Sequence, residues 1–412
     1  MANPINSGPV KDDSSVPSSS RRSFLGLSAL GLSAAASGAL AFRVITEPML
    51  AHAFAQNVSK NGIRIDANEN PLGPSTSARE AAGAIVANGG RYCDWLTDDL
   101  TKTMAAAHGL TVEQVLIYPG SSEPLHHAVR VFASPQRSYV TADPGYEAGM
   151  FHAGAIGAKV IKVPLTKTYA HDVKAMIAAA PDAGVFYICS PNNPTGTLTS
   201  HSDIQYLLDN KPKDSVVVVD EAYIHFCDAP SVVDLVKAGK DLIVLRTFSK
   251  IYGMAGLRCG AAFGRADLLE KLDKFGGWNA MPITALVAAS ASIKDAQLIP
   301  ERKRINARVR GEVFAWLDSH GYSYIPSEAN FFMLDTKRPA KTAIDAMAKQ
   351  NVFIGRIWPV MPTYSRVTIG TAPEMEEFQT AWQRVMSNAV TASVNSQPIV
   401  GKRNLDGIVF RA

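Results

Sequence analysis

The chain has 412 residues, of which 47% are hydrophobic and 19% are charged, an ordinary composition for a globular protein long enough to hold two cores. Its formal net charge is +4 and no basic stripe stands out, which argues against nucleic acid as a partner. The four cysteines, Cys93, Cys189, Cys227 and Cys259, are far apart and show no metal-ligand spacing. This pattern argues against a zinc site and against a disulfide framework.

The N-terminal segment departs from this ordinary composition. Residues 1–20 are rich in Ser, Pro, Asp and Asn, which predicts disorder. The pair Arg21 and Arg22 then precedes a mildly apolar run diluted by Gly, Ser and Ala, and a small-residue "AFA" ends at Ala55. This resembles a twin-arginine export signal cleaved near Ala55, with the export machinery as a partner and a periplasmic or secreted product. The alternatives are an incidental arginine pair on a cytoplasmic protein, or a membrane anchor, which the short run disfavours.

An extended arm and a helix follow the leader. The arm "IRIDANENPLGPS" (63–75) is full of turn formers, and "SAREAAGAIVANGG" (77–90) predicts a helix that ends at its two glycines. From about residue 100 to 265, helical patterns alternate with short β-rich runs, which predicts an α/β fold with helices on both faces of a sheet. The run "SVVVVD" is continuously apolar, as expected of a strand buried in a parallel sheet. The β-rich runs are "QVLIYPG", "SYVTADPG", "AKVIKVPL", "GVFYICSP", "SVVVVDEAY" and "DLIVLRTFSK".

A second, smaller α+β domain is predicted toward the C-terminus. The charged helix "LIPERKRINARVRGEVFAWLDSHG" leads into "YSYIPSEANFFMLD", "AIDAMAKQNVFIG" and "SRVTIGT", a strand–helix–strand pattern, and no pattern is clear after about Asn388. The predicted division is a leader and export signal (1–55), an N-terminal arm with part of the small domain (56–90), a large domain (91–285), a small C-terminal domain (286–390) and a tail (391–412).

Polar clusters follow several predicted strands, at the sheet edge where open α/β sheets bind ligands. "LIYPG" leads into Ser121 and Ser122 at a helix start, which suits an anion, although a simple serine cap is the alternative. Tyr146 after a Pro-Gly turn is either an exposed turn residue or an aromatic plate against a planar ligand. Asp220 ends "VVVVD" and either caps the next helix or holds a buried cation.

Lys250 follows the buried run "DLIVLR" directly, where burial would penalise its charge. A lysine desolvated beside other cations loses basicity, and a neutral amine is a nucleophile that can form a Schiff base. Thr247, Ser249 and Arg258 are spaced to bind a phosphate from the same loop, and Asp220 would pair with a protonated pyridine nitrogen. Together these residues predict a site for pyridoxal 5′-phosphate (PLP).

An ordered set of motifs carries a family resemblance. "SPNNPTG", "DEAY" and "SK…GLRCG" resemble a fold-type I PLP-dependent aminotransferase of class I/II. "ANENPLGP", "RY" at 91–92, "SEANF" and "RVTIGT" narrow the resemblance to the histidinol-phosphate aminotransferase-like branch, from about residue 62 to 385. It implies a three-layer, mostly parallel sheet with a smaller α+β domain. It also implies a transaminase that moves an amino group between an L-amino acid, or an amino phosphate, and a 2-oxo acid.

The resemblance also implies roles for cofactor-binding residues. Lys250 would form the Schiff base with PLP and shuttle the proton, and Asp220 would hold the pyridine N–H. Tyr92 matches a tyrosine that reaches the phosphate from the neighbouring subunit, which implies a homodimer with shared active sites. The remaining implied contacts are Tyr223 and Asn193 to the cofactor O3′, Tyr146 stacked on the ring, and Ser121, Ser122, Thr247, Ser249 and Arg258 to the phosphate.

Four residues would face the substrate. Arg366 matches the arginine that clamps the substrate α-carboxylate, Arg356 lies where the family places an arginine toward the substrate side chain, and Asn330 belongs to "SEANF". Trp358, in the unusual loop "FIGRIWPVMP", either lines the pocket and favours an apolar or aromatic side chain or packs between the domains. The segment "FGGWNAMP" (275–282) also departs from the family pattern and is expected near the substrate.

Two other functions stay open at this stage. One is an amino-acid decarboxylase on the same fold, which would keep Lys250, Asp220 and Arg258 and would release carbon dioxide. The other is a PLP-binding module without catalysis, which the full catalytic set and the missing helix-turn-helix disfavour.

Overall fold

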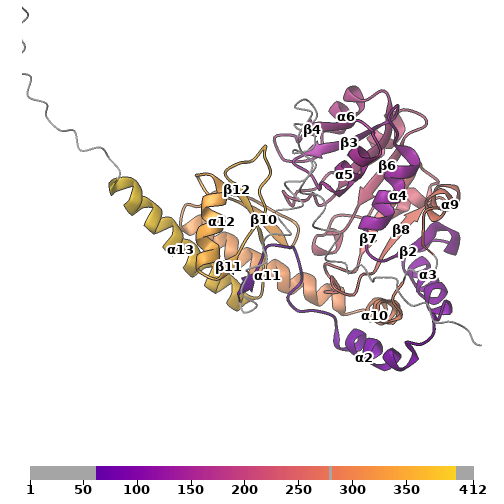
Figure 1. Ribbon diagram of the computed structural model, residues 1–412, viewed down its shortest axis with the longest axis horizontal. Coiled ribbons are helices and arrows are strands. Elements are labelled where there is room, and N and C mark those ends of the chain that lie inside the picture. The colour runs from indigo at the N-terminus through magenta and orange to yellow at the C-terminus, as the bar shows by residue number, and fades with distance from the viewer. Residues whose placement is uncertain (1–61, 278–280, 396–412) are drawn as a thin grey trace, which may run out of the picture. The chain divides into compact units, whose positions relative to one another are not determined.

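The computed structural model describes residues 62–277 and 281–395, with the backbone alone for 388–395 (Figure 1). The predicted export signal, including Arg21, Arg22 and Ala55, lies outside these residues, as do the central positions of "FGGWNAMP". Within the described ranges, no helix combines the length and the apolar character that a bilayer span requires.

A seven-stranded sheet forms the centre of the large domain (Figure 1). Six of its strands run parallel, and β8 is antiparallel to both of its neighbours, β7 and β2. The mostly parallel α/β sheet predicted from the sequence is therefore confirmed. In spatial order the strands are β2 (Val115–Tyr118), β8 (Gly260–Gly264), β7 (Leu242–Thr247), β6 (Val216–Asp220), β5 (Ala183–Cys189), β3 (Ser138–Asp143) and β4 (Val160–Pro164).

Strand β8 was not predicted, because its sequence "GAAFG" lacks the β-branched residues that favour strands. Close packing of the backbone around position 260 requires a glycine there. A Cβ atom there would lie 2.6 Å from the carbonyl carbon of Gly120 and 2.8 Å from the backbone oxygen of Arg246. Gly260 thus lets β8 approach the start of the loop that leads into α4.

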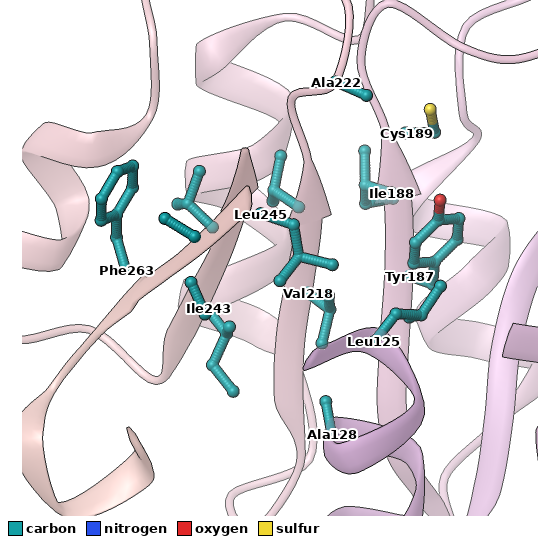
Figure 2. Packing of buried hydrophobic residues seen from close by; sticks show 14 of the residues in the cluster. Leu125, Ala128, Tyr187, Ile188, Cys189, Val218, Ala222, Ile243, Leu245 and Phe263 are labelled. Atoms are coloured by element: carbon teal, nitrogen blue, oxygen red, sulfur yellow. The ribbon is translucent and has the colours of Figure 1, made fainter. Parts of the chain in front are cut away.

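Helices connect the strands and bury their apolar sides against the sheet. Figure 2 shows Leu125 and Ala128 of α4 near Tyr187 and Val218 of the central strands, and all four side chains belong to one buried cluster. The connecting helices are α3 (Trp95–His108), α4 (Ser122–Phe132), α5 (Ala148–Ala155), α6 (Val173–Ala179), α7 (His201–Asn210), α8 (Val233–Lys237) and α9 (Ala266–Asp273), with 3-10 turns η2 (Val86–Asn88), η3 (Val112–Gln114) and η4 (Ile224–Phe226).

The small domain has its own core and its own sheets. A second buried cluster contains Phe332, Val367, Phe378 and Trp382, separate from the cluster of the large sheet. The predicted smaller α+β domain is therefore present. Its antiparallel sheet has the order β12 (Tyr364–Thr368), β10 (Phe331–Asp335), β9 (Tyr324–Ile325), and β1 (Ile63–Arg64) pairs in parallel with β11 (Val352–Phe353). Its helices are α11 (Leu298–Ser319), α12 (Ala340–Lys349) and α13 (Ala372–Asn395).

The N-terminal arm is shared between the two cores. Strand β1 belongs to the small domain, whereas α2 (Thr76–Ile85) packs on α10 (Ile283–Lys294) and buries Ala78 in the cluster of the large sheet. Leu286 of α10 lies in that same cluster. The domain boundary expected at residue 285 would therefore fall inside α10, because this apolar helix packs with the large domain.

Candidate active site

The ends of three adjacent parallel strands bring the predicted cofactor residues to one edge of the sheet. Asp220 is the last residue of β6 and Thr247 the last of β7, while Asn193 lies in the loop after β5. The register pairs Cys189 with Asp220, so the ends of β5 and β6 are level. The sequence predicted this convergence, because the carboxyl ends of parallel strands share one edge.

Asp220 is a buried carboxylate, 4% exposed, with two defined hydrogen-bond donors. The Tyr187 hydroxyl donates to Oδ2 at 2.9 Å, and the Ala222 amide donates to Oδ1 at 3.0 Å. Burial raises the pKa of Asp220 to about 6, although both hydrogen bonds and the charge of Lys250 oppose the rise. The sequence analysis did not identify Tyr187 as a partner of Asp220. The signal that could have identified it is a hydroxyl group within the otherwise apolar strand "AGVFYIC" (Figure 2).

Lys250 is partly buried just beyond β7. Its amine donates to the backbone oxygen of Ala67 at 3.4 Å and lies 5.6 Å from the ring centroid of Tyr223. Desolvation by burial, followed by the charge of Arg366, lowers the pKa of Lys250 to about 8. About a tenth of this amine is therefore neutral, and thus nucleophilic, at pH 7, far more than for a lysine of ordinary pKa.

A cationic, hydroxyl-rich cradle lies beside Lys250. The Thr247 hydroxyl donates to Ser249 Oγ at 2.8 Å, and Nη1 of Arg258 donates to the same oxygen at 3.1 Å. Nη2 of Arg258 donates to the backbone oxygen of Pro119 at 3.2 Å, which ties this loop to the start of α4. Gly120 makes the approach possible: its φ is +98°, and a Cβ there would lie 2.0 Å from Arg258 Nη2.

The start of α4 completes this cradle. Ser121 occupies the N-cap position, but its side chain makes no capping hydrogen bond with the helix. The N–H groups of the first turn therefore keep their affinity for an anion. Ser122 Oγ lies 3.4 Å from the hydroxyl of Tyr146, so the structure also brings this predicted ring-stacking residue to the helix start.

Arg366, which is predicted to face the substrate, is a buried arginine that is 3% exposed. Its Nη1 donates to Asn193 Oδ1 at 2.7 Å and its Nη2 to the backbone oxygen of Asp66 at 2.8 Å. Burial lowers the pKa of Arg366 to about 10. Its Nε is buried and has no hydrogen-bond partner within the described residues, so the side chain keeps a donor for a further acceptor.

Arg356 and Trp358 adjoin Arg366 from the loop after β11. Arg356 Nη2 forms an ion pair with Glu147 Oε1 at 2.5 Å, which the sequence did not predict. Trp358 is 2% exposed, and its indole N–H donates to the backbone oxygen of Gly145 at 3.0 Å. This burial favours the packing interpretation of Trp358, and its contact with a substrate stays a prediction.

The arm residue Asn68 links both domains and was missed in the sequence. Its Nδ2 donates to the Tyr223 hydroxyl at 3.1 Å, and its backbone N–H donates to Thr368 Oγ1 at 2.9 Å. Asn330 holds the arm through a bond from its Nδ2 to the backbone oxygen of Asn68 at 3.3 Å. The sequence offered only an asparagine within the turn-rich segment "ANENP". In the structure the φ angle of Asn68 is 54°, a conformation that asparagine tolerates better than most residues.

Tyr92 is not brought into this cluster. Its side chain is 74% exposed and makes no hydrogen bond to the other predicted site residues in the described part of the chain. Its predicted role depends on a second subunit.

The donor set fits PLP. A cation, two hydroxyls and helix amides form one cradle for a phosphate, and the buried Asp220 carboxylate suits a protonated ring nitrogen. Lys250, with its lowered pKa, is the amine that the chemistry requires, and the charges of both Asp220 and Arg258 act on it. Among the described residues, no group of three or more His, Cys, Asp or Glu side chains could hold a metal ion.

The family described as aminotransferase class I and II matches residues 60–382. The chain belongs to that family. The chain is 33% identical over 335 residues to the histidinol-phosphate aminotransferase of Moorella thermoacetica, covering 80% of this chain and 86% of the relative. It is 34% identical over 331 residues to histidinol-phosphate aminotransferase 1 of Dechloromonas aromatica, covering 79% and 90%.

Solved aminotransferase structures share the fold. A putative histidinol-phosphate aminotransferase from Erwinia carotovora atroseptica superposes with a TM-score of 0.78 at 32% identity, covering 81% of this chain and 98% of that one. The Sinorhizobium meliloti enzyme, solved in complex with pyridoxal 5′-phosphate, gives 0.75 at 23% identity, covering 87% and 100%. Family membership confirms the predicted enzyme class: a PLP-dependent aminotransferase acting on small amino and oxo acids.

Proposed function

We propose that this aminotransferase binds its substrate carboxylate at Arg366 and moves the substrate proton with Lys250. The observation that carries the proposal is the contact of both groups with one pair of aromatic rings. Lys250 lies 5.6 Å from the centroid of the Tyr223 ring, and Arg366 lies 5.6 Å from that of Phe331. The centroids of these two rings are 4.8 Å apart. The charge of Arg366 is the second cause, after burial, of the lowered pKa of Lys250. An amino acid whose carboxylate is held by the Arg366 guanidinium would present its α-carbon to the Lys250 amine.

The cofactor, when bound, supplies an electron sink for the charge that develops at the substrate α-carbon. Asp220 would hold its ring nitrogen, and Tyr223 and Asn193 would hold its ring hydroxyl. The phosphate would lie in the cradle of Thr247, Ser249, Arg258 and the α4 amides, with Tyr146 against the ring. Asn193 also accepts from Arg366, so carboxylate binding and cofactor orientation would be coupled through one amide.

A half-reaction experiment tests the proposal. Single L-amino acids, and L-histidinol phosphate because the relatives carry that name, are added to the PLP-loaded protein without an oxo acid. The expected result is a change in cofactor absorbance, one equivalent of carbonyl product per site, and reversal by a 2-oxo acid with one carboxylate, such as pyruvate. Stoichiometric carbon dioxide release would instead identify a decarboxylase.

We also propose a homodimer with shared active sites, supported by the exposure of Tyr92 and by its match to a cross-subunit tyrosine. Two inactive single variants, Tyr92→Ala and Lys250→Ala, are unfolded, mixed and refolded together. If Tyr92 acts across the interface, hybrids contain one intact site and regain activity. A monomer in analytical ultracentrifugation, or mixed samples no more active than their parents, would contradict the proposal.

Export through the twin-arginine route is a further proposal, supported by Arg21, Arg22 and the "AFA" that ends at Ala55. Replacing both arginines by lysine is expected to retain the full-length chain in the cytoplasm. Fractionation that finds the variant exported as well as the wild type would contradict this proposal.

A further inference from the structure

Glu147 follows the predicted ring-stacking residue Tyr146 and forms an ion pair with Arg356 at 2.5 Å. We propose that Glu147 is a specificity-determining residue: by neutralising Arg356, it makes the site select substrates with one anionic group over substrates with two. This inference rests on the proposed function, in which Arg366 holds the carboxylate of the substrate.

The two arginines of the site differ in how their charge is compensated. Arg366 donates to neutral oxygens, the Asn193 amide and the Asp66 carbonyl, and its Nε has no hydrogen-bond partner in the described ranges. Arg356 donates to a carboxylate, Glu147. The site as built therefore offers one uncompensated guanidinium to a substrate, and a second anion has to compete with Glu147 for the other.

Trp358 holds this arrangement in place. Its ring centroid lies 5.0 Å from the guanidinium carbon of Arg356 and 5.5 Å from that of Arg366, so one aromatic ring contacts both cations. Its indole N–H donates to the backbone of Gly145, two residues before Glu147. The tryptophan and the carboxylate that flank Arg356 are thus anchored to the same turn, which favours the paired position of Arg356.

The other charged groups nearby do not reverse this preference. The charge of Glu147 contributes, after burial, to a raised pKa of Asp143. The amine of Lys162 lies 3.8 Å from Oδ2 of Asp143. Asp66 pairs with Arg64 through Oδ2, while its Oδ1 is buried without a hydrogen-bond partner in the described part of the chain. Both carboxylates therefore have a cation of their own nearby, and Glu147 remains the carboxylate that pairs with Arg356.

The test compares two unreactive acids that share one carboxylate. Glutarate, a dicarboxylate, and 3-phenylpropanoate, a monocarboxylate, are titrated by calorimetry into the PLP-loaded wild type and into Glu147→Gln. We expect the wild type to bind 3-phenylpropanoate more tightly. Glu147→Gln keeps the shape but removes the charge, and should raise the affinity ratio of glutarate to 3-phenylpropanoate about tenfold. Adding Arg356→Gln to this variant should abolish the gain.

Glu312→Gln is the matched control, because Glu312 pairs with Arg308 on the exposed surface of α11 and should leave the ratio unchanged. Three results would overturn the inference: tighter glutarate binding by the wild type, an unchanged ratio in Glu147→Gln, or binding of neither acid. Failure of the loaded protein to transfer any amine would contradict the proposed function instead, and the calorimetric ratio is measured independently of that reaction.

Discussion

The guanidinium of Arg366 and the amide of Asn193 join the two domains: Nη1 donates to Oδ1 at 2.7 Å. Arg366 lies on β12 of the small domain, and Asn193 lies in the loop after β5 of the large sheet. The residue expected to recognise the substrate is therefore held by a residue expected to orient the cofactor.

Replacing Arg366 with lysine tests this link. Lysine keeps the charge but cannot hold Asn193, the Asp66 carbonyl and a carboxylate at once, because it lacks the planar fork. We expect kcat/KM to fall about 100-fold with the PLP content retained. Steady-state kinetics would measure this, with the exposed Arg308→Lys as control. Unchanged kcat/KM would remove Arg366 from carboxylate binding.

Lys250→Ala is expected to lower multiple-turnover activity by at least about 1000-fold, because it removes the amine that we propose moves the proton. The far-UV circular dichroism spectrum should stay that of the wild type, since Lys250 lies in a loop. Lys240→Ala, which removes a surface lysine paired with Asp209, is the control and should stay active. Sustained turnover by the alanine variant would show that another base serves the site.

Asp220 should make the stability of the cofactor-free protein depend on pH. Its pKa rises from 3.8 to about 6 on folding, so the folded protein keeps a proton that the unfolded chain loses in this window. The stability that Asp220 contributes is therefore full below about pH 4 and is lost as the pH rises through about 6, a change of about 3 kcal/mol. Urea unfolding of the wild type and Asp220→Asn at several pH values would measure the difference. A constant difference between them would contradict the prediction.

Gly120→Ala should weaken PLP binding. The new Cβ would displace the end of Arg258, which lies 2.0 Å from its position, and would strain a residue with φ +98°. We expect an increase of about tenfold in the Kd for PLP, because a charge-assisted phosphate contact is disturbed. Fluorescence titration of the cofactor-free protein would report it. Gly83→Ala, on the open surface of α2, should bind PLP like the wild type.

The buried pair of Glu221 and Arg246 should stabilise the sheet edge that carries Asp220 and Thr247. Arg246 Nη2 lies 2.6 Å from Glu221 Oε2, with both side chains buried. Glu221→Gln would leave a buried cation without its counter-ion, at a cost of about 3–5 kcal/mol in the free energy of unfolding. Denaturant titration would measure it, and the exposed-pair variant Glu312→Gln should lose less than about 1 kcal/mol. Equal losses would show that burial does not strengthen the pair.

The sequence was informative about the strand ends because local chemistry identifies them. Lys250 and Asp220 each contrast with the apolar run that precedes them, and parallel pairing brings such residues to one edge. All six β-rich runs predicted from the sequence form strands, β2 to β7, because they contain the β-branched and aromatic residues that favour strands. Strand β8 was not predicted because glycine and alanine have little preference for strands. It is a strand because it pairs with its two neighbours, β2 and β7.

The residues that were missed depend on contacts between distant parts of the chain. Tyr187 gains its role only when β5 lies beside β6, and Glu147 only when the loop after β11 brings Arg356 to it. No local spacing encodes either contact. Asn68 shows the same dependence, since its partners Tyr223 and Thr368 belong to two different domains.

The shared N-terminal arm sets a limit on how far the chain can be shortened. Within a few residues it contributes a strand to the small domain, the Asn68 contact to Tyr223 and a helix that packs on the large domain. A chain that began after Ile63 would lose pairing in β1, and one that began after Asn68 would also lose the contact to Tyr223. The stability of the small domain and the assembly of the candidate active site therefore depend on the same short stretch of backbone.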